Sequence, residues 1–425
     1  MFLHIVRKGD SLFEIGKRYK VDVNRLVSDN AILDPNKLVV GQSLIIRPEN
    51  TKHVVEAGDT LTSIANRYGI TVDQILNFNS NIESPESINV GDEIQIIFSN
   101  YNKEPMEING YCYDNIDLDT LRAALPYLTY LSIFSYNIRR DGSLTSVNDD
   151  KLISEAYKYR VASLLTVTNM SSPGNFSGEL VHDIFVNEAA SNRLIEEILR
   201  KIQEKGYRGV NIDFEYLDPS DRENYNNFLR EITARLNPLG YIVITALAPK
   251  TSADQPGILY EAHDYEAQNE IVNRIILMTY EWGYLYGPEM PVAPIDKVEE
   301  VIQYAVTAID SNKILMGIPN YGYDFTLPFV EGRPARIITN NEAIKIAIDN
   351  NASIQYDAKA ASPFIVYFQN GVEHNVHFED ARSIIEKITL AKDYNLGGLS
   401  YWTIMSDFPQ NWIIVDYYID VIKVL

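Results

Sequence analysis

Two carboxyl side chains alternate with apolar residues in the segment Gly-Val-Asn-Ile-Asp-Phe-Glu-Tyr at positions 209–216. If the segment is a strand, Asn211, Asp213 and Glu215 share one face and apolar residues occupy the other. Neighbouring carboxyl groups in a buried strand are costly unless they are paired or protonated, and each raises the pKa of the other. A raised pKa suits a group that donates a proton near neutral pH. The segment therefore predicts acid catalysis by Glu215 beside Asp213.

The same acids could instead form ion pairs or bind a metal. Lysine or arginine residues from other segments would neutralise them. A metal site would need further acids or histidines at ligand spacing, and none accompanies the segment. The six histidines are scattered, and we expect the short segment with His374 and His377 to form a turn. We therefore expect no metal and no cofactor.

The elements that would position the acids are apolar runs that alternate with amphipathic segments from residue 106 to residue 425. Helices expected at 192–205 and 223–236 separate some of these runs, a pattern typical of an α/β fold with a parallel sheet. Eight such runs predict a (β/α)8 TIM barrel, whose chemistry lies at the C-terminal ends of the strands. The expected strands are 108–111, 131–136, 161–168, 210–215, 242–247, 275–280, 314–318 and 398–402.

The longest gap between two expected strands separates the seventh from the eighth. It contains a strand-like run at 364–368 and a helical pattern at 341–348. We therefore expect a small α+β insertion over about residues 322–378.

The first hundred residues contain a repeat, because His4–Leu12 recurs as His53–Leu61, 49 residues later. In each copy a short strand precedes Gly-Asp, and the next residue is suited to cap a helix. Further apolar patterns predict a second helix and a closing strand at 44–46 or 94–96. We therefore expect two βααβ units, at 1–48 and 52–98, and a linker at 99–105.

The two repeats resemble the lysin motif, a module that binds N-acetylglucosamine in peptidoglycan and chitin. The resemblance implies that glycan contacts the loop after the first strand and the loop between the second helix and the second strand. For any single residue, the alternative is that it only makes the turn or caps the helix. The implied contact residues are Gly9, Asp10, Ser11 and Ile32 in the first copy and Gly58, Asp59, Thr60 and Ile82 in the second.

Residues 106–425 resemble the family 18 glycoside hydrolases, whose fourth barrel strand carries the signature D-G-x-D-x-D-x-E. This chain matches its last half, whereas Arg208 and Asn211 replace the first two acids. Further matches are Ile133–Tyr136, Met278–Glu281 and Trp402, although the family usually has Asp at the position of Glu281. The resemblance therefore spans several strands.

The family 18 resemblance implies a retaining, substrate-assisted mechanism without an enzyme nucleophile. Glu215 would protonate the glycosidic oxygen while the acetamido carbonyl of the sugar attacks the anomeric carbon. Asp213 would orient the acetamido group, and Tyr280 would donate a hydrogen bond to its carbonyl. Without the resemblance, Tyr280 and Trp402 would be expected to be core aromatics. The implied substrate-binding residues are Tyr111, Asn211, Met278, Glu281 and Trp402.

The combination of two lysin motifs with this barrel resembles the spore cortex-lytic N-acetylglucosaminidases of endospore formers. It implies hydrolysis of β-1,4 bonds of N-acetylglucosamine in cortex peptidoglycan during germination, and hence a location in the spore. The alternatives are a chitinase or endo-N-acetylglucosaminidase, and a glycan-binding spore protein without activity. Retention of Glu215 argues against the last of these.

The composition fits a protein that binds a neutral polymer. With 37 basic and 58 acidic residues the net charge is -21, which disfavours nucleic acids. No apolar run approaches the length of about 18 residues that a membrane-spanning helix needs, and the first residues lack the features of a signal peptide. The single cysteine, Cys112, excludes an internal disulfide. We expect a soluble monomer that is not exported by the Sec route.

Overall fold

The computed structural model describes residues 1–68, 70–82, 84, 87–98 and 103–425. Residues 99–102, most of the expected linker, lie outside these ranges. The remaining part of the expected linker already contains the start of the first barrel strand, at Glu104. Within the described ranges, every helix is too short or too polar to span a lipid bilayer.

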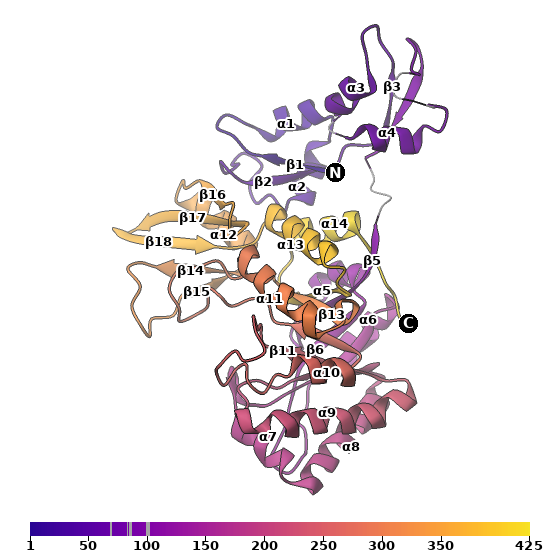
Figure 1. Ribbon diagram of the computed structural model, residues 1–425. Coiled ribbons are helices and arrows are strands. Elements are labelled where there is room, and N and C mark those ends of the chain that lie inside the picture. Colours follow the sequence, from indigo (N-terminus) through magenta and orange to yellow (C-terminus); the bar gives the residue numbers. More distant parts are fainter. Residues whose placement is uncertain (69, 83, 85–86, 99–102) are drawn as a thin grey trace.

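The larger part of the chain is a closed barrel of eight parallel strands, as the sequence predicts (Figure 1). The eighth strand pairs with the first, so the sheet has no free edge at the closure. A short strand, β20 (Ile419–Val421), also pairs with the first. The barrel strands are β5 (Glu104–Tyr113), β6 (Tyr130–Asn137), β7 (Ala162–Thr168), β10 (Gly209–Asp213), β11 (Ile242–Leu247), β12 (Arg274–Leu277), β13 (Ile314–Pro319) and β19 (Gly398–Trp402).

Amphipathic helices surround the barrel and cover the outward side chains of its strands. Val210, Ile212 and Phe214 of the fourth-strand segment belong to this apolar layer, so the polar residues between them face the barrel interior. The covering helices are α5 (Leu118–Ala124), α6 (Asp150–Lys158), α7 (Gly178–Phe185), α8 (Glu188–Lys205), α9 (Arg222–Leu236), α10 (Tyr265–Ile271), α11 (Ile295–Ala308), α13 (Ala381–Asp393) and α14 (Pro409–Tyr418).

Two barrel strands end earlier than expected, β10 at Asp213 and β12 at Leu277. The chain leaves the sheet after Asp213 because the backbone of Glu215 bonds to a side chain instead of to a neighbouring strand. Glu215 therefore lies in the loop that follows β10, at the C-terminal end of the barrel.

The expected α+β insertion lies between β13 and α13 (Figure 1). Its sheet packs on helix α12 (Asn340–Asp349). The prediction of a turn at His374 and His377 is wrong, because both belong to a regular strand whose partners lie on either side. The five strands are β14 (Gly322–Thr326), β15 (Arg336–Ile338), β16 (Ile354–Asp357), β17 (Ser362–Gln369) and β18 (Val372–His377).

Each N-terminal repeat forms the expected βααβ unit with its own apolar core. In both units a buried histidine lies between the aspartate of the Gly-Asp pair and a tyrosine, with His4 Nε2 2.9 Å from Asp10 Oδ2 in the first and His53 Nε2 2.8 Å from Asp59 Oδ2 in the second. The elements are β1 (Phe2–Ile5), α1 (Leu12–Tyr19), α2 (Val23–Asp29) and β2 (Ser43–Ile46), then β3 (Thr51–Val54), α3 (Leu61–Tyr68), α4 (Val72–Phe78) and β4 (Glu93–Ile96).

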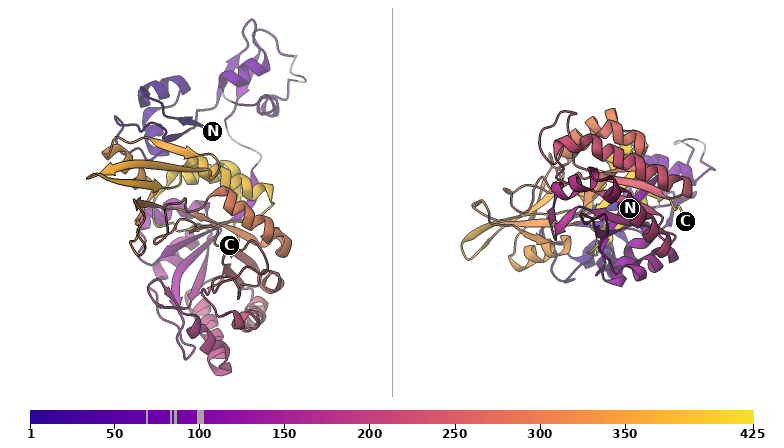
Figure 2. Two further views of the ribbon diagram at one scale, coloured as in Figure 1. Left: turned by 60° about the vertical axis from the view of Figure 1, so that its left-hand side comes forward. Right: turned by 90° about the horizontal axis from the view of Figure 1, so that it is seen from below.

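The first repeat is docked on the barrel and its insertion, while the second extends further from them (Figures 1 and 2). Gln410 Nε2 of α14 donates hydrogen bonds to Asn30 Oδ1 at 2.8 Å and to the carbonyl of Ser43 at 2.9 Å. Val39 is buried in the apolar core of the insertion. Val90 of the second repeat is 70% exposed, against 42% for Val40 at the matching position of the first. The two repeats thus use the same fold in different surroundings.

Candidate active site

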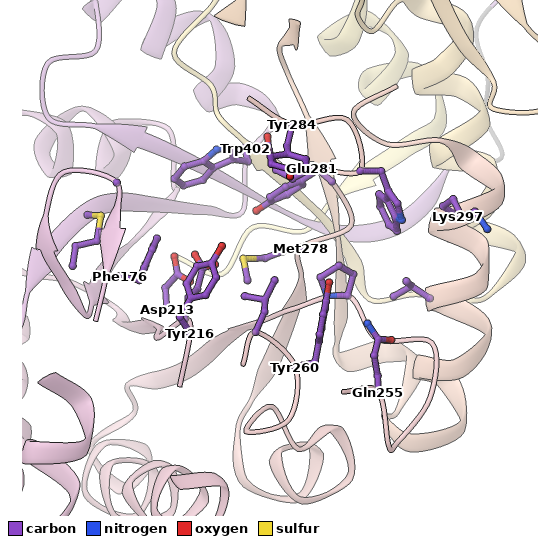
Figure 3. Close-up of a pocket in the computed structure, with 18 of the residues that line it drawn as sticks. Phe176, Asp213, Tyr216, Gln255, Tyr260, Met278, Glu281, Tyr284, Lys297 and Trp402 are labelled. Atoms are coloured by element: carbon purple, nitrogen blue, oxygen red, sulfur yellow. The ribbon is translucent and has the colours of Figure 1, made fainter. Parts of the chain in front are cut away.

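A cavity of about 770 Å³ opens at the C-terminal ends of the barrel strands. Its lining combines carboxyl groups with aromatic rings, and Figure 3 shows side chains from several loops converging on it. The cavity therefore lies at the end of the barrel where the sequence analysis expects the chemistry. Six of the residues singled out in the sequence line this cavity together: Asp213, Glu215, Met278, Tyr280, Glu281 and Trp402.

Among the described residues, no lysine, arginine or histidine forms an ion pair with either of the two central carboxyl groups, Asp213 and Glu215. Burial raises the pKa of Asp213, whose side chain is 3% exposed. Burial also raises the pKa of Glu215 well above its ordinary value, and the negative charges of Asp213 and Glu281 raise it further. Among the described residues, Asp213 Oδ1 has no hydrogen-bond partner. This environment keeps Glu215 protonated at a pH where an ordinary glutamate is ionised.

The backbone around Glu215 is held by two buried side chains for which the sequence predicts no role. Asn169, which follows β7, donates through Nδ2 to the carbonyl of Glu215 at 2.8 Å and accepts from its N–H at 3.0 Å. His263 Nε2 lies 3.0 Å from the carbonyl of Phe214, and burial lowers the pKa of this histidine to about 4. A neutral His263 donates this bond, because its Nδ1 accepts from the N–H of Ala248.

Asn211 and Tyr111 lie beneath the cavity and not on its surface, contrary to their expected part in substrate binding. Both are buried, and Asn211 Nδ2 donates to the hydroxyl oxygen of Tyr111 at 2.6 Å. Their side chains point into the closed interior of the barrel because they precede the residues at the strand ends. Tyr111 and Asn211 lie under the residues that line the cavity, and the ring of Tyr111 packs against Trp402.

Aromatic rings surround Trp402 at the end of β19. Its ring centroid lies 4.9 Å from that of Phe134, 5.2 Å from that of Tyr111 and 6.2 Å from that of Tyr113, and all three pairs are edge to face. This packing fixes the indole while leaving it part of the cavity wall. Such a surface suits the apolar face of a sugar ring.

Glu281 is held by the insertion. Its carboxylate accepts hydrogen bonds from the hydroxyls of Tyr321 and Tyr323, and the Tyr323 oxygen lies 3.0 and 3.1 Å from the two carboxylate oxygens. Desolvation raises the pKa of Glu281, while these two bonds lower it. The insertion therefore positions one of the three acids in the cavity.

The expected glycan contacts of the repeats lie outside this cavity, in the two N-terminal units. Gly9 and Gly58 adopt φ of 94° and 92°, and no heavy atom of the described residues lies within 4 Å of a Cβ built on either one. Asp10 and Asp59 are tied to the buried histidines described above. The side chain of Ile32 is 8% exposed and packs in the core of the first repeat, which corrects the prediction that it contacts glycan.

The remaining three expected contacts lie near these loops. Ser11 caps α1 by accepting from the N–H of Glu14, and Thr60 accepts from the N–H of Ser63. Ile82 is partly buried against the core of the second repeat. The capping role expected of the hydroxyl residues is therefore present in both repeats.

Comparison with known proteins assigns the barrel and the two N-terminal repeats to known families. The model of glycosyl hydrolases family 18 matches residues 99–407, and the model of the LysM domain matches residues 4–47 and 53–96. The chain belongs to glycosyl hydrolases family 18. This family 18 protein is a glycoside hydrolase that also binds glycan through its LysM domains, and the resemblances stated from the sequence are confirmed.

Relatives of this family 18 enzyme share its whole length. It is 43% identical over 432 residues to the cortical fragment-lytic enzyme of Bacillus subtilis (strain 168), covering 100% of this chain and 99% of that protein. The crystal structure of the spore cortex-lytic enzyme SleL of Bacillus megaterium QM B1551 superposes with a TM-score of 0.88 at 37% identity, over 100% of this chain and 99% of that one.

A more distant structure matches the barrel alone. The chitinase of Chromobacterium violaceum ATCC 12472 has a TM-score of 0.68 at 24% identity and covers 73% of this chain and 98% of its own. Its likeness supports the fold of the catalytic part and nothing more.

Proposed function

We propose that this enzyme hydrolyses β-1,4 bonds of N-acetylglucosamine in spore cortex peptidoglycan and so helps to degrade the cortex during germination. The observation that carries the proposal is the pair of unneutralised carboxyl groups, Asp213 and Glu215, in a cavity walled by Trp402. The full-length relatives named for lysis of cortical fragments and cortex support the substrate.

In the proposed reaction Glu215 donates its proton to the oxygen between two sugars. The acetamido oxygen of the reacting sugar attacks the anomeric carbon as that C–O bond breaks, which gives a cyclic oxazolinium ion and a free hydroxyl on the leaving sugar. Water then attacks the same carbon and gives up a proton to Glu215, so that the original configuration returns. Two inversions at one carbon make the reaction retaining.

The other cavity residues prepare the sugar for this attack. Asp213 orients and stabilises the acetamido N–H, and its otherwise unpartnered Oδ1 is the acceptor for that role. Tyr280 donates a hydrogen bond to the acetamido carbonyl, and Trp402 supports the sugar ring. Glu281 and Met278 complete the wall around the reacting sugar.

The replacement of the usual second aspartate by Asn211 leaves Asp213 with a neutral neighbour. An amide accepts and donates hydrogen bonds but does not take up a proton at working pH. We infer that the enzyme keeps its activity with an altered pH profile, since Asn211 cannot share a proton with Asp213.

We further propose that the enzyme works as a monomer in the spore, with the LysM domains holding the polymer through the loops at Gly9–Ser11 and Gly58–Thr60. The names of the relatives support the location.

Product analysis tests the reaction and its substrate together. Purified cortex fragments, chitin and N-glycans are incubated in parallel with the enzyme, and the products are analysed by mass spectrometry. We expect cortex fragments that end in reducing N-acetylglucosamine with retained β configuration. Release from chitin or N-glycans alone would replace this substrate with the chitinase or endo-N-acetylglucosaminidase alternative. Binding of cortex without any product would reject the reaction.

A further inference from the structure

The catalytic cavity continues past the carboxyl groups into a further region, which combines polar side chains with apolar ones such as Leu259 and Val301. We call it the side lobe, and it lies between the loop after β11 and helix α11. In Figure 3, Gln255, Tyr260 and Lys297 lie on the opposite side of the cavity from Phe176 and Asp213. The lining of the side lobe includes Thr251, Gln255, Tyr260, Trp282, Lys297 and Glu300.

The side lobe adjoins the place where the leaving part of the substrate lies. Glu215 protonates the oxygen between the two sugars, so the leaving sugar begins at Glu215 and extends away from the sugar on Trp402. Strand β11 is the hydrogen-bonded neighbour of β10, so the loop after β11 borders the loop that carries Glu215. Because one continuous cavity joins them, the leaving sugar reaches the side lobe with its substituents.

The side lobe contains a cation and an amide beside one acid, Glu300, whereas the catalytic part contains three acids and no cation among the described residues that line it. Lys297 is the single lysine or arginine among the described residues that line the cavity, and its Nζ lies 2.7 and 3.0 Å from the carboxylate oxygens of Glu300. Gln255 Oε1 accepts from the N–H of Thr251 at 2.7 Å and from its hydroxyl at 3.2 Å. This anchoring leaves the amide nitrogen of Gln255 as a donor to a ligand.

An ammonium and an amide N–H both recognise carbonyl or carboxylate oxygen, and a charged donor makes the stronger bond. The three acids of the catalytic part, Asp213, Glu215 and Glu281, repel a carboxylate when they are ionised. A substrate that carries a carbonyl substituent therefore gains most when that substituent lies in the side lobe. Tyr260 and Trp282 supply apolar surface for the sugar that carries it.

We propose that the side lobe binds the lactyl-derived carbonyl group on O3 of the leaving sugar, with Lys297 and Gln255 as its donors. This inference rests on the proposed function. Peptidoglycan alternates N-acetylglucosamine with a sugar that carries a lactyl group on O3, as a free acid, a peptide amide or a closed lactam, and chitin lacks that group. The side lobe thus determines specificity and takes no part in bond cleavage.

The test compares two soluble substrates of equal length, a glycan fragment with the lactyl group as a free acid and a chito-oligosaccharide. The measured quantity is the ratio of their kcat/KM values, lactyl substrate over chito-oligosaccharide. In the double variant Lys297→Gln, Gln255→Ala we expect this ratio to fall about tenfold or more, because a hydrogen bond to a charged group is lost. The control Lys345→Gln removes the same charge from an exposed position on α12, and there the ratio stays at the wild-type value.

A third substrate, which carries the lactyl group as a lactam, and a further variant show which chemical form of the substituent the side lobe prefers. Glu300→Gln frees Lys297 from its partner, so we expect the ratio to rise for both forms, and more for the free acid than for the lactam because a charged acceptor makes the stronger bond. An unchanged ratio in the double variant for both acid and lactam would overturn the side-lobe inference while the wild-type enzyme still cleaves both. Failure of the wild-type enzyme to cleave any lactyl-bearing fragment would instead reject the proposed function.

Discussion

The docking of the first LysM domain is tested by placing a methyl group at Gly41 and at its counterpart in the second domain, Gly91. Both glycines have positive φ, 87° and 96°, so alanine pays a similar backbone cost of about 1–2 kcal/mol at either one. A Cβ at Gly41 would lie 1.8 Å from the carbonyl oxygen of Ile354, whereas a Cβ at Gly91 would have no heavy atom of the described residues within 4 Å. The difference between the two variants therefore isolates the docking contact.

The expected difference in docking free energy between Gly41→Ala and Gly91→Ala follows from the hydrogen bonds at this contact. The N–H of Ile354 donates to the carbonyl of Val40 at 2.9 Å, and Arg382 Nη2 donates to the carbonyl of Gly41 at 3.3 Å. Relieving the clash separates these groups, and two bonds at about 1 kcal/mol each give a loss of about 2 kcal/mol. Since about 1.4 kcal/mol corresponds to a factor of ten, opening of the contact becomes about 30-fold more frequent.

Hydrogen exchange of the Ile354 amide measures this opening directly. Under native conditions we expect the amide to exchange about 30-fold faster in Gly41→Ala than in Gly91→Ala, with little change at amides of the barrel strands. Equal exchange in the two variants would refute the reasoning, because the contact would then open without breaking these bonds.

Three further predictions concern the cavity and the barrel. Glu281→Gln removes a charge that raises the pKa of Glu215, so the acid loses its proton at lower pH and the alkaline limb of the kcat/KM profile shifts downward; an upward shift would contradict this. Asn169→Ala frees the backbone of Glu215 and should lower kcat at least about tenfold, with unchanged circular dichroism. Arg274→Gln leaves the buried carboxylate of Glu107 without its cation and should lower the free energy of unfolding in urea by about 3–5 kcal/mol, whereas a loss below about 1 kcal/mol would contradict this.

Much of the barrel could be predicted because its signals are local. The strand 398–402 and the strand 242–247 appear in the structure with the predicted limits, since short apolar runs bounded by turns leave little choice of register. The repeat was also visible in the sequence, because both copies keep the strand, the Gly-Asp pair and the capping hydroxyl. Asp213 and Glu215 are predictable from their alternation with apolar residues in one segment, whereas Glu281 is identified only through the family resemblance.

The support of the site could not be predicted, because it joins segments that are distant in the chain. Asn169 and His263 bind backbone atoms around Glu215, and neither contact has a sequence pattern of its own. The end of β10 at Asp213 follows from the same contacts. Docking of one repeat depends on Gln410, which is 380 residues away from its partner Asn30, so the unequal surroundings of two similar repeats could not be inferred from the repeats themselves.

The most direct test of the central claim is the hydrolysis rate of cortex fragments by Glu215→Gln, measured as release of reducing ends. Glutamine keeps the shape of the side chain but has no proton to donate, so we expect kcat to fall about 100-fold to 10,000-fold. The control Glu266→Gln makes the same change at an exposed position on α10 and should keep the wild-type rate. A wild-type rate in Glu215→Gln would contradict the account, because another group would then protonate the leaving oxygen.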